Sequence, residues 1–322
     1  MIERDLLLNA TGAVLLAVLA WHHPALARHQ GRWGLALFVA GALLPFVDTA
    51  LYHAIAADRI DLLTRPPLLQ APLFGLLGIG VLALLAGVAA PPRLGWAVAL
   101  RLALGVGAGY AAHIALSVLT PVGWPLWAPF SLARASLPIL PGGHPPLLLA
   151  LLVGLALAEA LPRRRPWIAT GAAALAGVYV LTGALQYTIV AVRARALATP
   201  AAQEHVYPDG DWLLRWQVVL EAPERYELSR HRVLARPRPE PRVMPRWNDQ
   251  ALFLKLLGDP VVNRFYFRVF HHPVVRLDVS GSQITLLMQE LQDQSPLVPG
   301  PTFYLESDLS GRNRFYQLQR FN

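Results

Sequence analysis

Long apolar runs dominate the first 195 residues of the chain, and short alternating segments dominate the rest. A helix needs about 20 consecutive apolar residues to cross a bilayer. Runs near that length lie at residues 6–21, 33–57, 68–91, 95–120, 146–161 and 166–192. The pattern therefore predicts a membrane all-α helical bundle of about six spans, formed by residues 1–195.

The periodicity changes at about residue 200. Apolar and polar positions alternate over 212–220 and 225–234, which is typical of strands. A helical segment is expected at 249–270, broken at Asp259-Pro260, and further strands are expected at 274–279, 283–290, 302–306 and 315–320. Residues 196–322 are therefore predicted to form a small α+β or mostly β soluble domain.

The composition supports a membrane protein and excludes some other classes. The chain is 55% hydrophobic, and its net charge of +8 is uneven. Up to residue 195 there are 13 Arg against 6 acidic residues, and beyond it 15 Lys and Arg against 14. The basic surplus thus lies in the apolar half, where short-loop charges set topology, so no nucleic-acid partner is expected. The lack of cysteine excludes disulfides and thiolate metal sites.

The run Arg163-Arg164-Arg165 is the strongest topological signal. The excess of basic residues in cytoplasmic loops places this connection in the cytoplasm. With six spans, the soluble domain would then lie on the extracytoplasmic side. Arg193 and Arg195 favour the opposite orientation.

A polar stripe on the fourth apolar run marks a candidate binding site. His113 is an ionisable side chain in a segment where such groups are costly unless they are paired or face a cavity. Ser117 lies one turn further on the same helix face, and Thr120 lies close to it. The stripe leads into a loop with Trp124 and Trp127, which we expect to line the site.

Two further places carry ionisable groups of interest. Asp48 follows Pro45 in the second run, and an intramembrane carboxylate normally faces a partner in the bundle interior. His271 and His272 lie near Asp278 in the second half and could bind a metal, although a histidine pair in a loop is more often solvated.

Three motifs resemble a known family. Gly109-Tyr-x-x-His113, followed by Leu-Thr-Pro-x-Gly-x-Pro-Leu-x-x-Pro-Phe-Ser, is similar to the signature loop of the bacterial LexA-binding, inner membrane-associated metal-dependent hydrolases. Leu44-Pro45-x-x-Asp48 resembles their Pro-Asp-x-Asp segment, and Arg65 falls near their His-Arg-Gly-x-Thr-His-Ser segment. The resemblance implies a multi-pass protein of the bacterial inner membrane, related to zinc-dependent phospholipase C folds.

The chain departs from this family at most positions where the resemblance implies metal ligands. Phe46 replaces the first Asp of the Pro-Asp-x-Asp segment, both histidines of the segment around Arg65 are absent, and Leu7-Leu8-Asn9 stands where a histidine is usual. Ser117 takes the place of an Asp. Only Asp48 and His113 remain, whereas a hydrolytic zinc site normally keeps three protein ligands.

Three functions follow as hypotheses. The first is a membrane protein of this family that has lost catalytic metal binding, with Asp48 and His113 as a hydrogen-bonded pair. Its soluble domain would bind a protein partner or a lipid-like ligand. The second is an active hydrolase of a phosphoester or lipid-like substrate with a reduced metal site, in which Asp48 and His113 hold zinc or manganese, helped by Ser117, His53 or a histidine from the loops. A small transporter is a third, but the chain lacks the repeated broken helices of that class.

Overall fold

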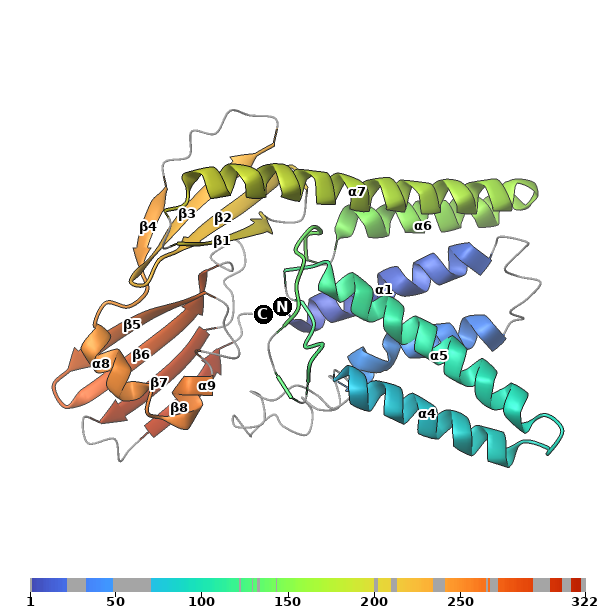
Figure 1. The fold of residues 1–322 in the computed structure, drawn as a ribbon, viewed down its shortest axis with the longest axis horizontal. Coiled ribbons are helices and arrows are strands. Elements are labelled where there is room, and N and C mark those ends of the chain that lie inside the picture. The colour runs from blue at the N-terminus through green and yellow to red at the C-terminus, as the bar shows by residue number, and fades with distance from the viewer. Residues whose placement is uncertain are drawn as a thin grey trace.

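The computed structural model describes most of the chain, and the account below is confined to that part. The described residues are 2–21, 33–48, 71–199 without 122, 129, 132, 133 and 143, 202–209, 213–233, 241–264, 266, 272–291, 302–308 and 314–319. The chain forms a helical half followed by two antiparallel sheets (Figure 1).

The helical half contains apolar helices of two lengths. Its elements are α1 (Ile2–Trp21), an unlabelled helix Trp33–Asp48, α4 (Pro72–Ala89), α5 (Gly95–Val118), α6 (Pro145–Ala160), the short 3-10 helix η2 (Pro162–Arg164) and α7 (Arg165–Leu197). Among the described residues, three segments are long and apolar enough to cross a membrane, namely α4, α5 and Pro162–Leu197. The apolar parts of α1, Trp33–Asp48 and α6 are shorter. The prediction of about six spans is therefore not supported by helix length.

The long helices expose apolar side chains on their outer surface. On α4, Leu77, Leu85 and Val88 have exposed fractions of 56%, 60% and 78%. Its buried positions are small or medium-sized, such as Gly75 and Ala83. Extended apolar surface of this kind is rare on soluble monomers and is expected where a helix faces lipid.

Small residues allow the helices to approach closely. A Cβ atom added at Gly109 of α5 would lie 1.9 Å from the carbonyl oxygen of Phe38, and one added at Gly41 would lie 2.0 Å from that of Val106. Helix Trp33–Asp48 and α5 therefore cross with their backbones in contact, as small residues permit in membrane bundles. On the other side, α1, α6 and α7 share a core that includes Leu15, Leu151 and Ala172.

The first sheet is covered on one face by the end of α7. Its strands are β1 (Gln203–Pro208), β2 (Arg215–Glu221), β3 (Arg225–Arg232) and β4 (Arg242–Pro245), paired in that order. Val190 and Ala194 of α7 pack against Trp216 and Val218 of β2. Because the other face of β2 meets the second sheet, this strand is buried on both sides, and every residue from Trp216 to Leu220 is buried, including the polar Gln217.

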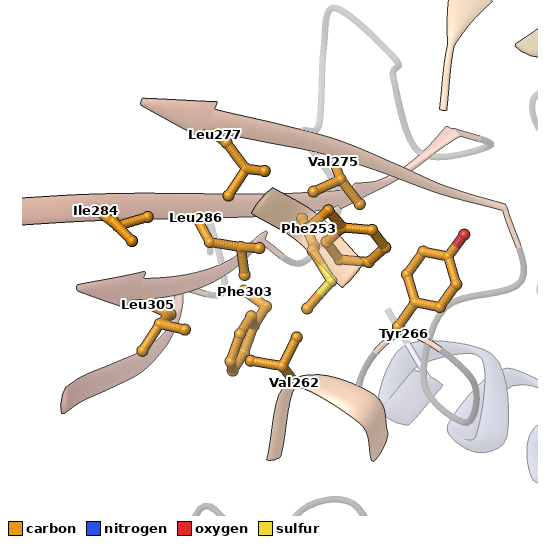
Figure 2. Close-up of a cluster of buried hydrophobic side chains, with 10 residues drawn as sticks. Phe253, Val262, Tyr266, Val275, Leu277, Ile284, Leu286, Phe303 and Leu305 are labelled. Carbon is orange, nitrogen blue, oxygen red and sulfur yellow. The ribbon is translucent and has the colours of Figure 1, made fainter. Parts of the chain in front are cut away.

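The second sheet has its own helical cover. Its strands are β5 (Pro273–Ser280), β6 (Gln283–Glu290), β7 (Thr302–Asp308) and β8 (Arg314–Gln319), again in sequence order. Helices α8 (Gln250–Leu256) and α9 (Pro260–Arg264) place Phe253 and Val262 over Leu286 and Phe303 (Figure 2). The predicted strands and the predicted break at Asp259-Pro260 are confirmed.

The two sheets meet through a small buried cluster. Tyr207, Val219 and Tyr226 of the first sheet pack with Val274, at the start of β5, and with Leu291. The backbone N–H of Val275 also donates to the carbonyl of Arg246, 2.8 Å away. The sheets therefore form one packed unit, here called the two-sheet domain, comprising β1–β8 with α8 and α9.

Candidate functional sites

The structure places the predicted polar stripe of α5 in the interior of the helical half. His113 is fully buried, and its ring makes an edge contact with Trp124 at a centroid separation of 5.4 Å. The carbonyl of Ala42 lies nearby, but neither ring nitrogen has a hydrogen-bond partner among the described residues. The hydrogen-bonded Asp48–His113 pair of the first hypothesis is therefore not formed.

Ser117 and Thr120 serve the local structure around His113. Asn9 of α1 donates from Nδ2 to the Ser117 hydroxyl oxygen at 2.9 Å, and both side chains are buried. The Thr120 hydroxyl donates to the Ser117 carbonyl at 2.8 Å, which satisfies a backbone acceptor at the end of α5. Both hydroxyls are buried and take part in hydrogen bonds within the helical half.

The remaining predicted residues are spread apart. Asp48 lies in helix Trp33–Asp48, is half-buried, and interacts electrostatically with Tyr110. Trp124 is buried, held by backbone hydrogen bonds to Ala135, whereas Trp127 is 68% exposed. Arg65 lies outside the described residues.

A second polar cluster lies where the two sheets meet, and it brings together three side chains of metal-ligand type. His205 of β1, Glu221 of β2 and His272, which directly precedes β5, each offer one ligand atom, and these atoms lie within 4.8 Å of one another. Glu221 Oε2 lies 3.3 Å from His205 Nε2 and 3.3 Å from His272 Nδ1. In the described part of the chain this is the one such group of three or more His, Cys, Asp or Glu residues.

Strand register explains why His205 and Glu221 meet. In the antiparallel β1–β2 ladder, His205 pairs with Val219 and Gln203 pairs with Glu221. His205 and Glu221 are therefore diagonal neighbours on the same sheet face, a separation that long side chains can close. Tyr207, two residues after His205, lies on this face as well. The face is turned toward the second sheet, from which His272 enters.

Neighbouring groups fix the orientation and charge of the cluster. The Tyr207 hydroxyl lies 2.8 Å from His272 Nε2, and Arg246 Nη1 lies 3.0 Å from Glu221 Oε1. The Arg246 guanidinium stands over the Tyr226 ring, 5.2 Å from its centroid. Contacts from His205 and His272 hold the pKa of the Glu221 carboxyl well below its usual range, and burial lowers the pKa of His272. Near neutral pH, Glu221 is thus ionised and His272 is neutral.

Of the three residues in this cluster, the sequence pointed only to His272. It singled out His272 but expected Asp278 as its companion, and Asp278 lies exposed on β5 while Glu221 meets the imidazole. His271 lies outside the described residues. His205 and Glu221 were missed because β1 was not predicted: it is a short edge strand whose side chains hardly alternate. Without β1, the pairing of its residues with those of β2 could not be used.

Comparisons with protein-family models, curated proteins and solved structures find no match. The resemblance to the membrane-associated hydrolases therefore stays a prediction, and the function has to be argued from the geometry of this chain.

Proposed function

We propose that this protein is a membrane-anchored, non-catalytic binding protein. Its helical half fixes it in the bilayer, and its two-sheet domain is held on the extracytoplasmic side as the binding part. The observation on which this proposal rests is that α7 runs without interruption from the apolar bundle into the core of the two-sheet domain.

The length of α7 matches a membrane crossing followed by a rigid extension. Trp167, which is 81% exposed, and Gln186 delimit 20 residues, or about 30 Å of helix, the thickness of the hydrocarbon layer. Gln186 accepts a hydrogen bond from the Trp216 indole at 3.0 Å, so the first sheet begins where the span ends. The last turns of the helix then pack on β2 through Val190 and Ala194. A continuous helix with such packing holds the domain close to the membrane surface.

Basic residues at the opposite end of the bundle support the orientation. The turn between α4 and α5 and the turn between α6 and α7 lie at the same end, far from the sheets (Figure 1). They contribute Arg93 and the run Arg163-Arg164-Arg165, in which Arg165 pairs with Glu159 at 2.7 Å. Exposed Trp96 and Trp167 lie beside these turns, as expected at a membrane–water interface. This basic end is therefore assigned to the cytoplasm.

The two arginines that favour the opposite orientation are engaged by the two-sheet domain. Arg195 pairs with Glu204 of β1, and Arg193 donates to the carbonyl of Val233 at 3.2 Å. Their positions follow from packing of α7 on the first sheet, so they weigh less as topological signals.

The chemistry around His113 argues against metal-dependent hydrolysis in the helical half. The resemblance implies metal ligands near Asn9 and at Ser117, but here an amide and a hydroxyl hydrogen-bond to each other. Both groups are neutral and weak metal donors. Within the described ranges, His113 and Asp48 also belong to no group of three close His, Cys, Asp or Glu residues. The Asn9–Ser117 pair therefore favours the non-catalytic function over the alternative of an active hydrolase.

The proposal is testable by single-cysteine labelling, because the chain has no natural cysteine. Ser282→Cys marks the exposed β5–β6 turn, and Pro92→Cys marks the exposed α4–α5 turn. In spheroplasts, a membrane-impermeant maleimide should label Ser282→Cys directly and Pro92→Cys only after permeabilisation. The reverse pattern would contradict the orientation. Release of the protein from membranes by alkaline carbonate would contradict the anchor.

A further inference from the structure

We propose that His205, Glu221 and His272 bind one divalent transition-metal ion, with zinc the first candidate. The inference deepens the proposed function, since it names what the two-sheet domain binds. It rests on the fold of that domain and not on the side of the membrane on which the domain lies.

Two of the three ligand separations fit a tetrahedral metal site, and all three ligand atoms lie within 4.8 Å of one another. Zinc binds imidazole nitrogen and carboxylate oxygen at about 2.0–2.1 Å, which places neighbouring ligand atoms of a tetrahedron about 3.3–3.4 Å apart. The two nitrogen-to-oxygen distances to Glu221 Oε2 are both 3.3 Å. Two His and one carboxylate form a set that suits zinc and other divalent transition metals.

The orientation of His205 also favours a metal. Its buried Nε2 atom has no hydrogen-bond partner among the residues that the structure describes, although Glu221 Oε2 is 3.3 Å away. The nitrogen and the carboxylate oxygen are thus close without forming a hydrogen bond of ordinary geometry. Buried polar atoms are nearly always satisfied, and an ion between these two atoms would satisfy both.

The surrounding residues are placed as outer-shell partners of a metal site. The Tyr207 hydroxyl lies 2.8 Å from His272 Nε2, and Nδ1 faces Glu221. In the tautomer with the proton on Nε2, that nitrogen donates to the Tyr207 oxygen, and Nδ1 carries the lone pair that a metal requires. Arg246 holds Oε1 of Glu221 and leaves Oε2 to the two histidines.

An ion-pair network without metal accounts for the cluster less well. Glu221 is already paired with Arg246, whose Nη1 lies 3.0 Å from Oε1, so the carboxylate does not need either histidine to balance its charge. A network of this kind would also be expected to align N–H groups with the carboxylate oxygens, which His205 does not do.

Two of the three side chains are partly exposed. His272 is 2% exposed, whereas the side chains of His205 and Glu221 are 30% and 21% exposed, and the ligand nitrogens His205 Nε2 and His272 Nδ1 are themselves buried. Closed structural zinc sites take four protein ligands, while sites with three leave one position to water or an external ligand. The proposed metal thus links the two sheets and has one coordination position left for water or a small external ligand.

The test uses the full-length chain in detergent, stripped with a chelator and titrated with zinc. We expect about one zinc per chain by elemental analysis and calorimetry. His205→Ala and Glu221→Gln each remove one ligand and should lower affinity by more than the roughly 10–100-fold typical of outer-shell changes. His231→Gln is the matched control, because His231 is buried in the same sheet but bonded to Ser229. It should retain zinc.

Two results would overturn the proposal. One is a folded wild-type chain that retains no zinc at micromolar concentrations. The other is zinc binding that survives both His205→Ala and Glu221→Gln, or that is lost instead in His113→Ala. Cysteine labelling of the same variants separates this outcome from the proposed function, because topology does not depend on the metal.

Discussion

The close crossing of α5 with helix Trp33–Asp48 makes Gly109 a critical position. A Cβ atom there would lie 1.9 Å from the Phe38 carbonyl oxygen and 2.8 Å from the Ala42 nitrogen. Since a carbon–oxygen contact needs about 3.3 Å, Gly109→Ala requires the two backbones to separate by about 1.4 Å. Both contacting atoms belong to the main chain of a helix, so no side chain can rotate away.

The expected cost of Gly109→Ala follows from these contacts. Overpacking a well-packed core costs about 1–3 kcal/mol, and a backbone clash belongs near the upper end. The higher helix propensity of alanine offsets at most about 1 kcal/mol of this loss of stability. The net result is a loss of about 1–2 kcal/mol, together with a shift of α5 that would disturb the buried Asn9–Ser117 contact.

Gly107 offers a matched control on the same helix. A Cβ atom at this position meets no described atom within 4 Å. Heating the detergent-solubilised protein and following the monodisperse fraction by size-exclusion chromatography should show a lower midpoint for Gly109→Ala, and an unchanged or higher one for Gly107→Ala. Equal midpoints for the two variants would show that the helices do not cross at Gly109 as described.

Two further predictions concern the two-sheet domain. Tyr207→Phe removes the hydroxyl that orients His272 and should weaken zinc affinity about 10–100-fold by calorimetry, whereas Tyr226→Phe, whose hydroxyl bonds the Pro273 carbonyl, should change it little. Equal effects of the two would refute the orienting role of Tyr207. Trp216→Ala leaves a cavity between α7 and β2 and should lower the free energy of unfolding by about 3–5 kcal/mol, which would be measured as faster proteolysis of the two-sheet domain in membranes. Trp96 is exposed, so Trp96→Ala should behave as wild type.

The regular strands could be predicted from the sequence because their side chains alternate. The expected segments correspond to β2, β3 and β5–β8, and the break at Asp259-Pro260 is where the Asp259 carboxylate accepts the backbone N–H of Val261 at 2.7 Å. β1 and β4 were not predicted. Both are short edge strands, and β1 has half of its residues partly or fully exposed, so its apolar pattern is weak.

The spans were overestimated because hydropathy measures apolar content and not helix length. The apolar part of α1 is Leu7–Leu19, and the polar residues Glu3 and Asp5 occupy its first turns. α6 reaches only from Pro145 to Ala160 before η2 begins. Such segments have the composition of a span without its length.

The metal cluster could not be found from spacing alone. His205 and Glu221 are joined by strand register, and His272 arrives only when the second sheet docks on the first. The cluster could be predicted only from the pairing of β1 with β2. Once His205 is known to lie opposite Val219, it follows that residues 205 and 221 are diagonal neighbours on the same face.

The polar cluster around His113 and the cluster between the two sheets differ in the charged groups that surround them. This difference is why the metal is proposed for the second cluster. Inside the apolar bundle, His113 is surrounded by Trp124 and by neutral groups such as the Asn9–Ser117 pair, and a divalent ion there would be costly without anionic ligands. Between the sheets, an ionised carboxylate and a neutral imidazole are combined, beside a second histidine whose side chain is 30% exposed. The proposed division of roles, in which the helical half anchors and the two-sheet domain binds, places the metal in the second cluster. Zinc that depends on His205 but not on His113 is the result this division requires.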